Sequence, residues 1–129
     1  MYRSVQRVPE FADVNHVARI YTAEGALMVP SDFDGATAFT LTVYDDEGVS
    51  VYTESQSLIN SPDVHTYDPV ELGGYWTKDS KGYNFHNTLV ASDYGYSGGR
   101  TYRAVYLLVS QTHGTIPLVF IDQCEAVSV

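Results

Sequence analysis

Four histidines are the side chains in this 129-residue chain best suited to acid–base or metal chemistry: His16, His65, His86 and His113. A zinc site needs several His, Cys, Asp or Glu ligands brought together, commonly in pairs at short spacing. Each histidine here falls in a different predicted element, with no partner at ligand spacing. The sequence therefore predicts no metal site, and we expect the histidines to lie in solvent or at strand edges.

Two acidic clusters resemble fragments of cation sites. The run Asp32-Phe33-Asp34-Gly35 begins like a calcium loop, but an EF-hand loop starting at Asp32 needs a glutamate where Val43 stands. We interpret it as an Asx turn. The second cluster, Asp45-Asp46-Glu47, follows a strand-like run and ends in a glycine, which is typical of a soluble hairpin tip.

No residue pattern typical of catalysis accompanies these clusters. The sequence contains no glycine-rich phosphate loop, no nucleophile elbow, no Cys/His dyad signature and no motif flanking a carboxylate pair. The single cysteine, Cys124, cannot pair within the chain, and we expect it to be a small buried or half-buried residue in the last strand. The sequence therefore predicts a non-enzymatic protein without a cofactor.

Eleven tyrosines and one tryptophan suggest a second kind of chemistry, the stacking of aromatic rings on sugars. Tyr94 and Tyr96 lie in the loop of small residues at 91–99, where a recognition surface is commonly placed. A carbohydrate-binding module requires these two rings to be exposed and coplanar. Buried core or protein-interface tyrosines are the competing interpretation.

Charge narrows the range of partners. Sixteen acidic and seven basic residues give a net charge of −9, and a chain of this charge repels phosphate backbones, so we expect no nucleic-acid partner. No signal peptide, lipidation motif or apolar run of membrane-spanning length is visible, so we expect no membrane partner. The length fits a single domain.

Alternating apolar residues predict the elements that position these side chains. The clearest pattern covers residues 37–53, where Phe39, Leu41 and Val43 share one face of a hairpin. Further strands are predicted at 14–21, 57–60, 64–67 and 86–90, and an aromatic hairpin is predicted around the Lys81-Gly82 turn, with Trp76, Tyr83 and Phe85 in the core. No segment shows a helical period longer than two turns.

The fold class predicted from these strands is all-β, an antiparallel β-sandwich of seven to nine short strands. We assign residues 13–129 to this single domain and residues 1–12 to an N-terminal arm or edge strand.

The last hairpin differs from the others because it is apolar on both faces. Tyr102, Ala104, Tyr106 and Leu108 alternate with Val105, Leu107 and Val109, and residues 116–121 repeat the pattern. A strand pair of this kind needs a second cover, which a neighbouring subunit or the N-terminal arm would provide. The candidate interface residues are Val5, Val8, Val105, Leu107, Val109, Val119 and Ile121.

Several of these runs resemble a pattern in the small immunoglobulin-like β-sandwich proteins of tailed bacteriophages, including N-terminal domains of baseplate upper proteins. The resemblance covers residues 35–121. The matching runs are Gly74-Tyr75-Trp76, Asp79, Gly82-Tyr83-Asn84-Phe85, Tyr102-Arg103-Ala104-Val105-Tyr106 and Pro117-Leu118-Val119-Phe120.

The resemblance implies a structural virion protein, made in the bacterial host cytoplasm and active through contacts with capsid, neck or tail proteins. It implies no catalytic residues. Because longer family members continue into receptor-binding or adaptor regions, a capsid decoration protein or a neck component fits this chain better than a baseplate adaptor. A homo-oligomer is expected. A carbohydrate-binding module and a generic host-cell adhesion domain remain as alternatives.

Overall fold

The computed structural model describes residues 2–22, 24–33, 39–56, 66–71, 82–110 and 113–127. They form two β-sheets and one short 3₁₀ helix, η1 (Pro30–Phe33), and the predicted all-β class is confirmed. Trp76, His65, the strand predicted at 57–60 and most of the hairpin predicted around Lys81-Gly82 lie outside the described residues.

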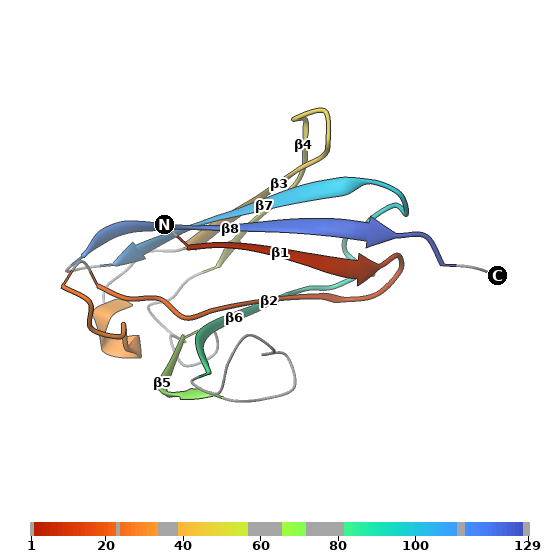
Figure 1. Cartoon of the computed structure of the whole chain (residues 1–129). Helices are drawn as coiled ribbons and strands as arrows, with labels where there is room; N and C mark the ends of the chain where they lie inside the picture. Colours follow the sequence, from red (N-terminus) through yellow and green to blue (C-terminus); the bar gives the residue numbers. More distant parts are fainter. Residues whose placement is uncertain are drawn as a thin grey trace.

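The larger sheet contains the first and the last strand of the chain side by side (Figure 1). Its order is β1 (Tyr2–Pro9), β8 (Gly114–Glu125), β7 (Thr101–Ser110), β3 (Phe39–Tyr44) and β4 (Ser50–Gln56). All of its neighbouring strands are antiparallel except β1 and β8, which are parallel. The purely antiparallel sheet expected from the sequence was wrong at this pair, because β1 leads into the other sheet rather than into a hairpin with its neighbour.

The smaller sheet has the order β2 (Val14–Ala18), β6 (Tyr83–Leu89) and β5 (Thr66–Glu71). The strand predicted at 14–21 ends at Ala18, because a side chain takes over the pairing beyond it. Asn84 Oδ1 accepts from the Ile20 amide at 2.7 Å, and Asn84 Nδ2 donates to the carbonyls of Ile20 and Met28 at 3.0 and 2.9 Å. A buried asparagine thus holds the segment 20–28 against β6.

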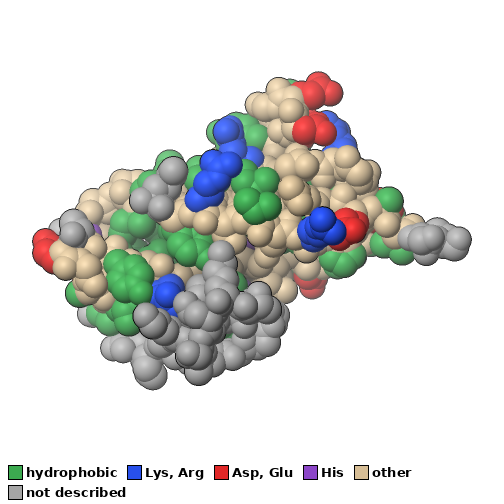
Figure 2. Space-filling model, viewed as in Figure 1, with side chains coloured by type: hydrophobic (Ala, Val, Ile, Leu, Met, Phe, Trp, Pro, Cys, Tyr) green, Lys and Arg blue, Asp and Glu red, His purple; other side chains and the backbone are tan. Residues whose placement is uncertain are grey.

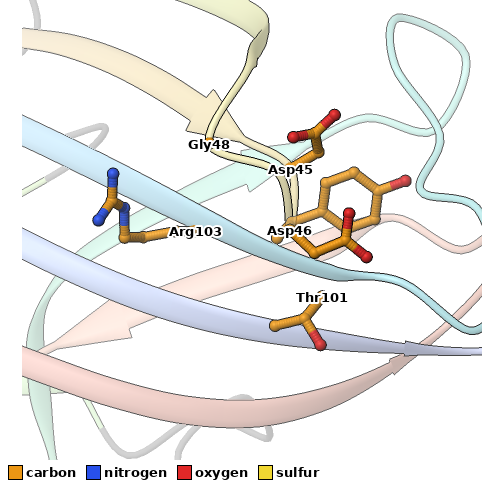
Figure 3. A pocket seen from close by; sticks show the side chains of 6 residues that line it. Asp45, Asp46, Gly48, Thr101 and Arg103 are labelled. Atoms are coloured by element: carbon orange, nitrogen blue, oxygen red, sulfur yellow. The ribbon is translucent and has the colours of Figure 1, made fainter.

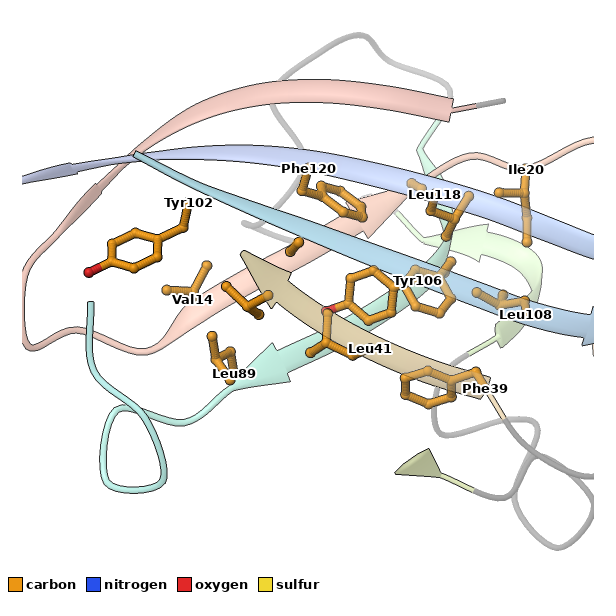
Figure 4. Packing of buried hydrophobic residues seen from close by; sticks show 14 of the residues in the cluster. Val14, Ile20, Phe39, Leu41, Leu89, Tyr102, Tyr106, Leu108, Leu118 and Phe120 are labelled. Carbon is orange, nitrogen blue, oxygen red and sulfur yellow. The ribbon is translucent and has the colours of Figure 1, made fainter. Parts of the chain in front are cut away.

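The core lies between the two sheets. Figure 4 shows Leu41 of the larger sheet on the same side of the cluster as Leu89 of the smaller one, and the rings of Phe39 and Tyr106 contact that of Phe85 in the smaller sheet. The alternation predicted for β3 is confirmed, since Phe39, Leu41 and Val43 are completely buried. The core assignments of Phe85, Tyr102 and Tyr106 are confirmed as well, whereas Tyr83 is buried with Val17 in a separate cluster. This two-layer arrangement is consistent with the predicted β-sandwich.

Candidate interaction surface

The larger sheet has one side turned away from the smaller sheet and the core. We call this side the outer face, and it carries most of the predicted interface residues. The strand register sets three of its rows: Pro117–Leu107–Thr40, then Arg3–Val119–Val105–Thr42, then Val5–Ile121–Arg103–Tyr44. Val109 lies one row beyond Leu107 on β7, opposite Thr115. Because side chains alternate along a strand, these rows point away from the core.

Exposure differs among the predicted interface residues. Val5, Leu107 and Val109 are 58%, 42% and 37% exposed, and Val105 and Ile121 are half-buried. Val119 is on the same face but buried between its neighbours Arg3 and Val105. The structure therefore brings six of the seven residues together on one surface.

Val8 is the residue that does not belong to this surface. It is buried in the core and pairs with Cys124 across β1 and β8. Its assignment as an interface residue was wrong, because a spacing of three along a strand puts Val8 and Val5 on opposite faces. Cys124 is buried in the last strand as predicted, and burial raises the pKa of its thiol.

Three arginines lie among the apolar residues of the outer face. Arg3, Arg7 and Arg103 are all exposed, and the Arg103 guanidinium lies 4.8 Å from the centre of the Tyr44 ring. The three rows defined above contain no carboxylate. Figure 2 shows arginine and hydrophobic side chains next to one another over this part of the molecule, with red carboxylates at the projecting β3–β4 hairpin tip and beside one blue side chain near the ends of β1 and β8. The outer face is therefore both apolar and basic, on a protein of net charge −9.

A buried polar network joins the two sheets beneath this face. His16 of β2 and Asp122 of β8 are completely buried, with His16 Nε2 2.6 Å from Asp122 Oδ2. Tyr96 Oη donates to the same carboxylate oxygen at 2.8 Å, and Gln6 Nε2 donates to Oδ1 at 2.9 Å. Burial alone would raise the pKa of Asp122, but His16 and these hydrogen bonds outweigh it and lower that pKa.

The other ring nitrogen of His16 faces Tyr106. His16 Nδ1 lies 2.5 Å from Tyr106 Oη, and that hydroxyl accepts from Asn87 Nδ2 at 3.0 Å. Because an ionised Asp122 carboxylate only accepts, the Nε2 proton of His16 goes to Asp122, while Nδ1 shares a hydrogen bond with the Tyr106 hydroxyl. The described residues contain no buried polar side-chain atom without a hydrogen-bond partner.

This network corrects the expectation that the histidines are solvated or at strand edges, because His16 is buried and paired. His86 is half-buried and bonded to Asn15 at 2.9 Å, and only His113 is exposed among the described histidines. The sequence pattern around Asp122 could have revealed this buried network. In the last strand Leu118, Phe120 and Cys124 alternate on the inward face, and the same period puts Asp122 there. A carboxylate at an inward position requires buried donors.

The two tyrosines proposed for glycan contact do not form an exposed platform. Tyr96 is 3% exposed and stacks on Tyr102, with ring centres 4.1 Å apart. Tyr94 is half-buried and meets the Tyr96 ring at 75° rather than coplanar with it. Burial raises the pKa of both hydroxyls, that of Tyr94 to about 12. The expectation of two exposed coplanar rings was wrong, because the loop at 91–99 folds inward over Tyr102.

A hollow of about 350 Å³ lies between the tip of the β3–β4 hairpin and the start of β7 (Figure 3). Asp45 and Asp46 line it, and both pair with Arg100, at 3.3 and 2.6 Å. The hydrogen bond from Arg100 lowers the pKa of Asp46. The hairpin tip predicted here is present: Asp45 Oδ1 accepts from the amides of Glu47 and Val49. Since Arg100 already pairs with both carboxylates, the hollow supports no ligand class.

The comparisons with known proteins identify no family for this chain. No family model and no curated protein matches it. Among the described residues, no helix is long and apolar enough to span a membrane. In the same part of the chain, no group of three or more His, Cys, Asp or Glu side chains is arranged to hold a metal ion. Asp32 of η1 instead accepts from the Val29 amide at 2.9 Å and lies 3.5 Å from His113.

Proposed function

We propose that this chain is a non-enzymatic structural protein that acts through protein–protein contacts made by the outer face. The observation behind the proposal is a group of exposed or half-buried apolar side chains that crosses the rows of that face, which we call the apolar row. Its members are Val5, Ile121, Val105, Leu107 and Val109. Antiparallel sheets that face water on one side alternate between apolar and polar residues. The outer face departs from this pattern on β7 and β8, which is typical of a surface that another protein covers.

We further propose that the fold is immunoglobulin-like and that the setting is the virion of a tailed bacteriophage, as a capsid decoration protein or a neck or baseplate component. The support is the sequence resemblance over residues 35–121, of which the runs at 82–85, 102–106 and 117–120 form β6, β7 and β8. Regular arrays of identical subunits suit a small domain with a large contact face. Carbohydrate binding has less support, because Tyr96 is buried.

The test is cosedimentation of the purified protein with capsids and tails of the phage that encodes it. Leu107→Glu puts a charge in the centre of the apolar row and should abolish binding. Val49→Glu is the matched control, because Val49 is 55% exposed but lies at the β3–β4 turn, away from the outer face. Equal binding by wild type and Leu107→Glu would contradict the role of the outer face, and no binding by the wild type would contradict the virion setting.

A further inference from the structure

A second exposed apolar cluster lies at the end of the molecule where β1 turns into β2. Phe11, Val90 and Val127 are 75%, 39% and 47% exposed, and we call them the end patch. Hydrogen bonds hold their segments together: the Val127 amide donates to Glu10 Oε1 at 3.2 Å, and the Ala91 amide donates to Asp13 Oδ1 at 2.8 Å. Figure 1 shows the β1–β2 turn and the C-terminus at the same end.

Phe11 is the unusual member of the end patch. Its φ of 66° makes it the one non-glycine residue with positive φ among the described residues, a conformation that costs free energy for a bulky side chain. The turn around it is fixed, because the Glu10 amide donates to the Glu125 carbonyl at 2.9 Å and Glu10 Oε2 accepts from the Gly98 amide at 2.7 Å. An exposed aromatic ring on a fixed, strained turn is typical of a contact residue.

The charge around the end patch is opposite to the charge on the outer face. Glu10, Asp13 and Glu125 belong to the hydrogen-bonded segments of the patch, and none of them forms an ion pair with a cation in the described part of the chain. The outer face carries Arg3 and Arg103 in its rows, and Arg7 lies opposite Gln123, one row before the Pro9–Glu125 pair at the border of the end patch. If two outer faces packed on each other around a two-fold axis, residues near the axis would meet their own copies. An axis at the central strand β7 would bring Arg103 against Arg103, and an axis at the edge strand β1 would bring its arginines together. The charges favour contact between unlike surfaces.

We infer that the occupant of the outer face is the end patch of a second copy of this chain. Phe11 contacts the apolar row around Leu107 and Val105, and the carboxylates beside it pair with the arginines of the other copy. This inference rests on the proposed function, in which the outer face is the contact surface. Since the two surfaces differ, each copy offers one of each, and the contact continues from copy to copy until it closes into a ring or extends as a filament.

The test uses two variants that each lose one surface. Phe11→Gly removes the ring of the end patch, and Leu107→Glu disables the outer face. Native mass spectrometry over a range of concentrations should find oligomers for the wild type and for the Val49→Glu control, and monomers for each variant alone. An equimolar mixture of the two variants should give one-to-one heterodimers and nothing larger, because only one compatible pair of surfaces remains.

Other results would overturn the inference. Wild-type monomers at every concentration, oligomers of Phe11→Gly like those of the wild type, or monomers only in the mixture would each contradict contact between unlike surfaces. Circular dichroism of both variants shows whether they are folded. If the wild type is monomeric but still binds phage particles through Leu107, the proposed function stands and this inference fails, so the two failures are distinguishable.

Discussion

Asp122 shows how one buried residue depends on donors from distant segments. It accepts hydrogen bonds from His16, Tyr96 and Gln6, which come from β2, the loop at 91–99 and β1. A buried carboxylate without such partners would cost several kcal/mol. The alternation of the last strand puts Asp122 inside, but the sequence does not reveal its donors. The pairing of β1 with β8 brings Gln6 to Asp122 over 116 positions, and the packing of the two sheets brings His16 to it over 106 positions.

Asp122→Asn should destabilise the fold by about 1–3 kcal/mol for each donor left without an acceptor. The amide keeps the shape of the carboxyl group but has one acceptor oxygen, so at least one of the three donors loses its partner. Tyr96→Phe, which removes one donor and leaves the carboxylate in place, is the milder comparison. Urea unfolding near neutral pH measures both, and equal stability of Asp122→Asn and wild type would contradict the network.

The pH dependence of the same variant gives a second prediction. The pKa of Asp122 lies below its ordinary value of 3.8 in the folded state. The carboxylate therefore contributes stability above about pH 4, and this contribution is lost as the pH falls through the folded-state pKa. The difference in unfolding free energy between wild type and Asp122→Asn should shrink as the pH drops below 4. A constant difference down to pH 2 would show that Asp122 is not ionised in the folded protein.

Phe11→Gly should raise the unfolding free energy by up to about 1 kcal/mol, because glycine adopts positive φ without steric cost. The gain is partly offset by the greater freedom of glycine in the unfolded chain. Thermal unfolding at a concentration where both proteins are monomeric is the measurement, and Phe11→Ala, which keeps a Cβ at the same φ, is the control. A large loss of stability in both variants would mean that the ring packs within its own copy.

Among the elements, β3 and β4 were predictable because period-two alternation and the turn chemistry of Asp45 and Gly48 agree. The parallel pairing of β1 with β8 was not, because no local pattern specifies which strand a chain end will join. For the candidate interface, too, local sequence patterns predicted one part and only the fold determined the other. Alternation predicted that Val105, Leu107 and Val109 share an outward face, whereas the end patch arises from segments near residues 11, 90 and 127 that only the fold brings together.

The two faces of β3 give a matched prediction at this scale. Leu41→Ala should cost about 2–5 kcal/mol, because Leu41 is completely buried. Thr42→Ala, one residue further on the outward face, should change stability by about 0.5 kcal/mol or less. Chemical unfolding of the two variants side by side measures the difference. Similar costs at both positions would mean that the outward face of β3 is covered within one copy.

For the whole molecule, the main feature is the uneven distribution of charge. A chain of net charge −9 carries Arg3 and Arg103 in the rows of the outer face, and Glu10, Asp13 and Glu125 in the segments of the end patch. If unlike surfaces attract one another, salt should weaken self-association, because the Debye length falls from about 10 Å at 0.1 M to about 3 Å at 1 M. Sedimentation velocity at increasing salt measures this. Association that strengthens with salt would indicate an apolar contact without charge pairing.

The pairing of β1 with β8 also determines when the fold can form during synthesis. Gln6 and Asp122, 116 residues apart along the chain, bond directly, and β8 separates β1 from the rest of its sheet. The ribosome makes residues 2–9 long before residues 114–125, with which they pair, so the larger sheet cannot close until both have been made. Non-local pairing of this kind slows folding. We expect the domain to fold only after the C-terminal strand has emerged, with the earlier strands exposed to aggregation until then.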